Sequence, residues 1–150
     1  MDLSTRGPWQ FDCDGETRTL ATAADVADAV RRCRTVPAGT LWISFDDGPR
    51  PWWQRFLGAS PRYVSGFATI TWSDGFAILM FLDDAWSEFR ASDPEQPVEP
   101  ALAIRERLAN GEPSPPAPEE CMSAERAFDA VLEALGSGSR PRWLRYQQLG

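Results

Sequence analysis

Residues 63–82 read YVSGFATITWSDGFAILMFL and decide the fold of this chain. Before the Asp-Gly pair at 74–75, apolar and polar side chains alternate, which is typical of a strand with one buried face. After that pair, residues 76–82 form an almost unbroken apolar run, which indicates a central strand covered on both faces. Asp-Gly favours a type I′ turn, because both central positions of that turn need positive φ. The stretch therefore predicts an antiparallel β-hairpin.

The flanking segments extend this hairpin into a sheet. Residues 40–45, rich in β-branched and aromatic side chains, predict a strand that ends in a turn at Asp46-Asp47-Gly48-Pro49. Residues 85–90 predict the third strand of a meander, and residues 142–146 predict a final strand that pairs with the sheet. Residues 50–58 carry four large apolar side chains among turn-forming residues, which predicts a packed loop or one short helical turn.

Two amphipathic helices are expected. Residues 23–34 place apolar side chains on one face at helical spacing, and Thr22 with Asp25 forms a capping box at the start. Residues 123–135 carry a second apolar stripe, with Gly136 as the closing residue. We expect a single α+β domain over residues 1–150, with an antiparallel sheet of about five strands and two main helices packed on one side.

The composition changes between residues 92 and 120, where seven of the 13 prolines lie. Proline tracts of this kind are extended and solvated, with polyproline character. Between the two tracts, residues 101–110 fit a short helix or an edge strand, and the sequence leaves both open. The domain is therefore expected to carry a proline-rich, solvated segment.

All 15 basic side chains are arginines, and the chain has no histidine and no lysine. This composition excludes His-based catalytic triads, His-ligated metals and Schiff-base chemistry. We therefore expect a protein that is not an enzyme and that uses no metal or cofactor. An enzyme that works with carboxylates alone is the alternative. The 22 acidic residues give a formal net charge of -7, which disfavours direct binding to nucleic-acid backbones.

The cysteines and the apolar runs bear on location. Cys13, Cys33 and Cys121 are odd in number and far apart, which indicates buried free thiols and neither a disulfide framework nor a CxxC site. The longest apolar run, residues 76–82, is far shorter than the roughly 20 residues that a membrane-spanning helix needs. The first six residues lack the pattern of a secretory signal. We therefore expect a cytoplasmic protein without membrane contact.

Six of the seven tryptophans divide into two groups by their predicted surroundings. Trp42, Trp72 and Trp143 lie in predicted strands, and we expect them in the core. The other three, Trp52, Trp53 and Trp86, lie in or beside predicted loops and close to acidic pairs. Loop tryptophans of this kind are frequent hot spots of protein interfaces. The second group is therefore a candidate for binding.

The candidate binding surface combines these loop tryptophans with carboxylates. Asp83, Asp84 and Glu88 beside Trp86 would form an acidic rim around an aromatic anchor, complementary to a basic partner. The full set of candidate binding residues is Asp46, Asp47, Trp52, Trp53, Asp83, Asp84, Trp86 and Glu88. Two structural alternatives stay open, because acidic pairs also serve turns and Trp52 with Trp53 can close the end of the sheet.

The central hairpin and the C-terminal end resemble a known family. Residues 66–75, GFATITWSDG, and residues 136–146, GSGSRPRWLRY, which follow the helix over 123–135, resemble the first immunity-protein family of bacterial polymorphic toxin systems. The resemblance covers roughly residues 40 to 147. The family's final strand typically ends on a tryptophan, whereas the matching position here is Tyr146, with Trp143 three residues earlier.

This resemblance implies both a fold and a function. Members of the family are small α+β proteins that bind a cognate toxin stoichiometrically and block its active-site cleft, and the toxin is often a nucleic-acid deaminase. The implied partner is a toxin domain with a basic substrate cleft. An acidic surface suits such a cleft, because carboxylates can occupy phosphate positions. The alternative is a protein-interaction module or scaffold whose proline tracts bind an aromatic groove of a host protein.

Overall fold

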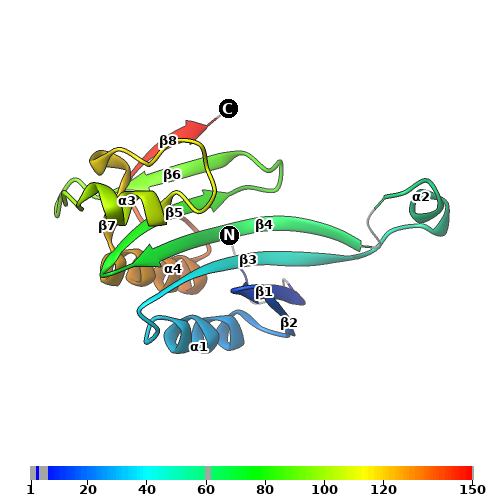
Figure 1. Cartoon of the computed structure of the whole chain (residues 1–150). Coiled ribbons are helices and arrows are strands. Elements are labelled where there is room, and N and C mark those ends of the chain that lie inside the picture. Colours follow the sequence, from blue (N-terminus) through cyan, green and yellow to red (C-terminus); the bar gives the residue numbers. More distant parts are fainter. Residues whose placement is uncertain (1–2, 4–6, 60–61, 150) are drawn as a thin grey trace.

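The computed structural model describes Leu3 and residues 7–59 and 62–149. These residues form one antiparallel sheet of eight strands with four α-helices (Figure 1). The strands are β1 (Trp9–Cys13), β2 (Glu16–Leu20), β3 (Ala38–Pro49), β4 (Arg62–Ser73), β5 (Phe76–Leu82), β6 (Glu88–Ser92), β7 (Met122–Ser123) and β8 (Arg145–Leu149). The helices are α1 (Ala23–Cys33), α2 (Trp52–Phe56), α3 (Leu102–Leu108) and α4 (Ala124–Ser137), with a 3-10 turn at Pro118–Glu120.

The strand order is β2-β1-β3-β4-β5-β6-β8, and β7 pairs with β5. All of the pairs are antiparallel. The predicted α+β class with an antiparallel sheet is thus confirmed, although the sheet is larger than the about five strands expected. No helix among the described residues is long and apolar enough to cross a membrane.

Two Asp-Gly turns form hairpins in the sheet, and both lie near the start of β3. Asp74 and Gly75, with φ of 53° and 85°, join β4 to β5 as predicted, and Ser73 lies opposite Phe76. Asp14 and Gly15, with φ of 51° and 87°, join β1 to β2. The sequence analysis missed this N-terminal hairpin although the same dipeptide marks it. The reason is that β2 is a polar edge strand whose residues are mostly exposed, so it lacks a hydrophobic pattern.

The core lies between the sheet and the two longer helices, α1 and α4, which pack on the same face as predicted (Figure 1). The Thr22 cap is confirmed, since its hydroxyl accepts the Asp25 N–H at 3.1 Å. Helix α4 runs past Gly136 and ends at Ser137, so the predicted closing residue is wrong; Gly138 takes the left-handed cap conformation, with φ of 78°. The largest fully buried side chains include Trp9, Phe11, Ile43, Leu79, Phe81, Val30, Phe128 and Val131.

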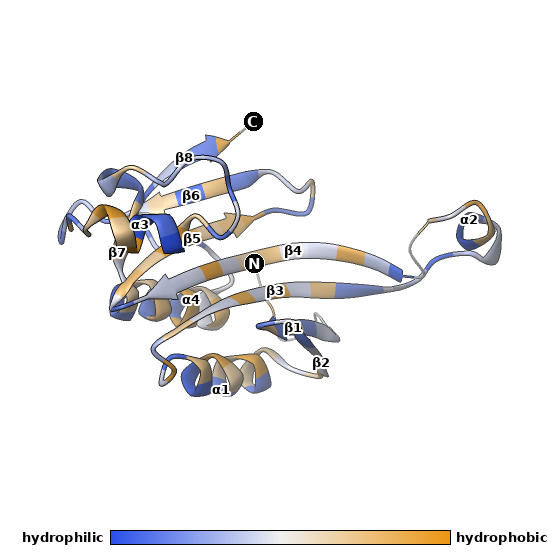
Figure 2. Ribbon diagram, viewed as in Figure 1, coloured by the Kyte–Doolittle hydropathy of each residue, from blue (hydrophilic) through white to orange (hydrophobic). Residues whose placement is uncertain are grey.

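The face of the sheet opposite α1 and α4 is called the open face below. Strand β5 is hydrophobic along its whole length (Figure 2). Because side chains alternate along a strand, Ile78 and Met80 lie on the open face while Leu79 faces the core. Helix α3 and residues 108–116 cover part of it. Arg105 donates to the backbone carbonyls of Pro100 and Pro116, at 3.2 Å each, and so joins the two proline tracts. The open choice for residues 101–110 is therefore resolved as a helix.

Strands β3 and β4 continue beyond their neighbours as a two-stranded extension, called the arm, whose described residues are 46–59 and 62–64. Strand β1 pairs with β3 only as far as Phe45, and β5 pairs with β4 only from Ala68. The predicted turn at Asp46–Pro49 is wrong, because these residues stay in β3, where Asp46, Gly48 and Pro49 pair with β4 and the register shifts between Asp46 and Gly48. Helix α2 caps the arm far from the rest of the molecule (Figure 1). It is the short helical turn foreseen for residues 50–58.

The C-terminal part is shifted relative to the prediction. The third strand of the meander begins at Glu88, and the final strand begins at Arg145 and pairs with β6. Trp143 therefore precedes the strand. Its half-buried ring packs under the guanidinium of Arg126, 4.2 Å from the ring centroid. Of the three tryptophans expected in the core, Trp72 is confirmed, with 3% of its surface exposed.

Candidate functional site

The eight candidate residues do not form one patch. Asp46 and Asp47 lie at the base of the arm, where it leaves the sheet. Trp52 and Trp53 lie at its far end, on α2. The remaining four lie on or next to the turn between β5 and β6, at residues 83–88. The chemistry differs between these three places.

At the base of the arm, Asp46 and Asp47 are bonded within the chain. Arg62 Nε lies 2.6 and 2.7 Å from the two carboxylate oxygens of Asp46, and the Gly48 N–H donates to one of them at 3.0 Å. Burial alone would raise the pKa of Asp46, but the Arg62 hydrogen bond, the Gly48 N–H and the Arg62 charge together lower it. Asp47 accepts a short hydrogen bond from the Ser65 hydroxyl. Both carboxylates thus brace the arm.

The turn between β5 and β6 holds a tryptophan in an unusual backbone conformation. Asp83 accepts the N–H groups of Ala85 and Ser87, at 2.9 and 2.8 Å, and closes the turn. Within it Trp86 has a φ of 61°, which a bulky side chain rarely adopts. A Cβ on Gly66 would lie 3.0 Å from the Trp86 ring, so this glycine leaves the space in which the ring sits. The turn is built around the position of Trp86.

Trp86 packs against Trp42 on the open face. Their ring centroids are 6.1 Å apart and the rings are tilted by 31°. Both remain accessible, with 44% of Trp86 and 38% of Trp42 exposed. The core position expected for Trp42 is therefore wrong. Alternation in β3 places Leu41 and Ile43 toward the helices and Trp42 on the opposite side. The pair forms an exposed aromatic ridge on a rigid sheet.

Two hollows flank this ridge. The larger, called the groove, has a volume of about 710 Å³ and lies between the sheet and residues 108–116. Its floor includes Trp42, Thr69 and Met80. The smaller hollow, of about 280 Å³, lies on the other side of Trp42 and is bordered by Asp12. Trp42 lines both hollows, so a partner seated on the open face would contact this ring from either side.

The groove is lined more by carboxylates than by cations. Its charged residues are Glu88, Arg90, Glu112 and Glu120. Arg90 donates to Glu120 at 2.6 Å, which leaves Glu88 and Glu112 as the excess negative charge of this lining. Among the described residues, no cluster of three or more cysteines and carboxylates has the arrangement of a metal site. The groove offers aromatic contact and carboxylate acceptors, which are the chemistry of binding a basic surface.

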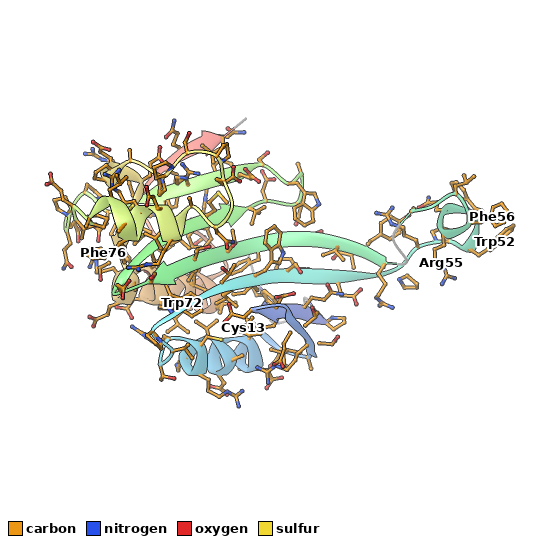
Figure 3. The ribbon with its side chains drawn as sticks, viewed as in Figure 1. Cys13, Trp52, Arg55, Phe56, Trp72 and Phe76 are labelled. Carbon is orange, nitrogen blue, oxygen red and sulfur yellow. The ribbon has the colours of Figure 1, made fainter. Side chains whose placement is uncertain are left out.

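The tip of the arm is the third place. Four apolar side chains project there with large exposed fractions, namely Trp52 (74%), Trp53 (51%), Phe56 (84%) and Leu57 (75%). Trp52, Arg55 and Phe56 are at the far end of the molecule, away from the body (Figure 3). The alternative that Trp52 and Trp53 close the end of the sheet is therefore wrong. Phe56 and Leu57 were not among the candidates, although both belong to the apolar set noted in residues 50–58.

The chain has been compared with models of known protein families and with curated proteins, and no match was found. The function is therefore argued from the residues and the geometry above.

Proposed function

We propose that this protein is an immunity protein that binds a cognate toxin stoichiometrically and covers its active-site cleft with the open face of the sheet. The observation that carries the proposal is the exposed Trp42–Trp86 ridge, set between two hollows and beside the carboxylates of the groove. Paired exposed tryptophans on a rigid scaffold provide a large contact area at a low entropic cost.

The charge of the groove supports a basic partner. A toxin that acts on nucleic acid needs a cationic substrate cleft, and the excess carboxylates Glu88 and Glu112 can pair with its cations. The overall charge of -7 favours rapid association with such a partner. A nucleic-acid deaminase is the toxin that the family resemblance suggests. The proposed binding surface includes the predicted residues Trp86 and Glu88, together with Trp42, whose ring is exposed beside Trp86.

In this proposal the proline tracts shape the binding surface and are not themselves ligands for another protein. Residues 108–116 form one wall of the groove, and Arg105 holds the Pro116 carbonyl. A tract anchored in this way shapes a binding surface and is less suited to leave it as a ligand for an aromatic groove elsewhere. The site of action is proposed to be the cytoplasm, where a toxin directed at nucleic acid would find its substrate.

Co-expression with the cognate toxin tests the proposal. The wild-type chain should restore growth and co-purify with the toxin in a fixed ratio. The variant Trp42→Ala/Trp86→Ala should lose at least about 2 kcal/mol of binding free energy, roughly a 30-fold weaker affinity. Val36→Ala, which truncates an exposed side chain away from the open face, is the control. Failure of the wild-type chain to neutralise any toxin encoded beside it would refute the proposal.

A further inference from the structure

The apolar tip of the arm, made of Trp52, Trp53, Phe56 and Leu57, has no cover within the described residues. All four side chains are more than half exposed, and no residue of α2 is buried. Contiguous exposed apolar groups of this size mark an interaction site. The tip is also basic, since Arg50 and Arg55 lie in it and no acidic residue occurs between Asp47 and Asp74.

The tip has a defined shape. Arg50 stacks on the Tyr63 ring, 4.5 Å from its centroid. Gln54 accepts from the Tyr63 hydroxyl at 3.1 Å and from Arg50 at 3.4 Å. These contacts connect α2 to both strands of the arm. A preorganised aromatic tip suits a preformed pocket in a protein, because little conformational freedom is lost when it docks.

A pocket of complementary chemistry lies at the base of the same arm. This base pocket has a volume of about 300 Å³ and lies on the helix side of the sheet. Apolar residues form most of its wall, namely Phe45, Phe67, Phe81, Leu82 and Phe89. Asp83 and Asp84 border it, while Arg140 packs over the Phe89 ring at 3.9 Å. An apolar pocket bordered by two carboxylates matches an aromatic tip that carries Arg55.

The tip cannot reach the base pocket of its own chain. Phe45 lines the pocket, and β3 from Phe45 to its end at Pro49 spans roughly 13 Å at about 3.3 Å per residue, with α2 beyond that end. The arm is a paired, extended ladder over this length, so it holds tip and pocket apart. Two arms laid antiparallel about a twofold axis, however, place the tip of each copy beside the base of the other.

We propose that two copies of this chain associate by exchanging arms, so that the apolar tip of each copy enters the base pocket of the other and Arg55 approaches Asp83 and Asp84. The ladder between β4 and β5 begins only at Ala68, so the edge of β4 at Tyr63–Ser65 that faces away from β3 pairs with no other strand among the described residues, and such edges readily pair with a second chain. The base pocket lies on the opposite side of the sheet from the open face, so this dimer leaves the Trp42–Trp86 ridge accessible. This proposed dimer forms without the toxin, so its test is independent of the proposed immunity function.

The test is the mass of the purified full-length chain in solution over a range of concentrations, by light scattering after size exclusion. The wild type should be a dimer that dissociates on dilution. Phe56→Ser, at a site that is 84% exposed, should raise the dimer dissociation constant at least about 10-fold. Arg32→Asp, a charge reversal on the exposed end of α1, should leave the constant unchanged.

A charge swap decides the geometry. Arg55→Asp alone and Asp84→Arg alone should each give monomers, because like charges then face one another in both interfaces. An equimolar mixture of the two variants should dimerise again, since each of its two interfaces holds an opposite-charge pair. Wild type that stays monomeric at every concentration, or a mixture that stays monomeric, would overturn the proposal. Binding of monomeric wild type to vesicles of anionic lipid would overturn it in favour of membrane docking.

Discussion

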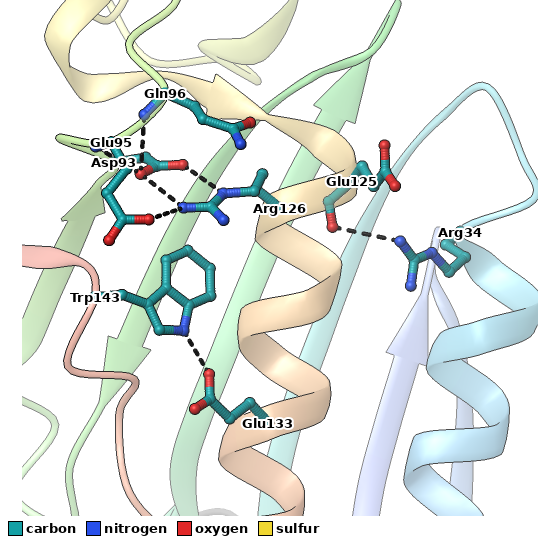
Figure 4. Close-up of polar contacts among 8 residues, drawn as sticks. All are labelled: Arg34, Asp93, Glu95, Gln96, Glu125, Arg126, Glu133 and Trp143. Carbon is teal, nitrogen blue, oxygen red and sulfur yellow. Dashed lines mark hydrogen bonds and ion pairs between the residues drawn. The ribbon is translucent and has the colours of Figure 1, made fainter.

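Arg126 on α4 donates from Nε and Nη2 to the two carboxylate oxygens of Asp93, at 2.8 and 3.1 Å (Figure 4). The carboxylate also accepts the N–H groups of Glu95 and Gln96, and only 1% of its side chain is exposed. The guanidinium also lies over the ring of Trp143, 4.2 Å from its centroid. One arginine thus joins the start of the proline-rich segment, the C-terminal helix and the chain ahead of β8.

Loss of this pair is expected to destabilise the fold. Asp93→Asn should lower the free energy of unfolding by about 3 kcal/mol, because it leaves a guanidinium that is 22% exposed without its buried counter-charge and with only the exposed Glu95 as an ion-pair partner. Urea unfolding measures the difference. Glu95→Gln is the matched control: Glu95 also bonds Arg126, at 3.1 Å, but 60% of its side chain is exposed, so its removal should cost about 0.5 kcal/mol. Equal effects of the two variants would contradict the structural role of Asp93.

The two buried carboxylates predict how stability depends on pH. Burial would raise the pKa values of Asp46 and Asp93, but hydrogen bonds from Arg62 and Arg126, from backbone N–H groups and the arginine charges lower both. Carboxyls with pKa values lower in the folded than in the unfolded state stabilise the fold above the unfolded value, about 3.9. Stability should therefore fall as the pH drops below about 4. Urea titrations from pH 6 to 2 should show a shallower fall for Asp46→Asn/Asp93→Asn than for wild type.

Local sequence patterns predicted the elements whose signals are short-range. The Asp-Gly hairpin, the Thr22 cap and the two apolar helix faces depend on neighbouring residues, and each was confirmed. The arm was missed because Asp46–Pro49 has the composition of a turn. Its extended form depends on Arg62, 16 residues later, which bonds Asp46 across the ladder. Pairing of this kind has no local signature.

The candidate site was predicted in part for a related reason. Loop position and nearby acids correctly indicated that Trp86 is accessible. Trp42 was expected in the core, because a strand of alternating large side chains does not reveal which face the helices cover. The pairing of β3 with β1 and β4 determines which of its faces the helices cover, and it places Trp42 on the open face. The ridge therefore depends on tertiary structure.

Two substitutions of Trp86 should separate the cost of its backbone conformation from the value of its ring contact with Trp42. Trp86→Gly and Trp86→Ala both remove the ring and its contact with Trp42, but only glycine adopts a φ of 61° without a steric cost. The glycine variant should be more stable than the alanine variant by about 1 kcal/mol in urea unfolding. Both variants should lose the same affinity for the proposed toxin partner. Greater stability of the alanine variant would show that the turn relaxes to another conformation.

Cys13 and Cys33 are far apart in the sequence but adjacent in the fold, and we expect that they can form a disulfide. Their Sγ atoms lie 3.1 Å apart, between β1 and the last turn of α1. Burial and the hydrogen bond with Cys13 raise the pKa of Cys33 to about 12, so attack by the Cys33 thiolate should be slow at neutral pH and faster as the pH rises. Oxidised glutathione should join the two sulfurs, releasing two molecules of reduced glutathione. Titration of free thiols should then find only the Cys121 thiol, and the closed loop should add up to about 3 kcal/mol to the free energy of unfolding.

The control is Cys13→Ser, whose free energy of unfolding should not change on treatment with the oxidant. Three free thiols in the treated wild type would refute the pairing.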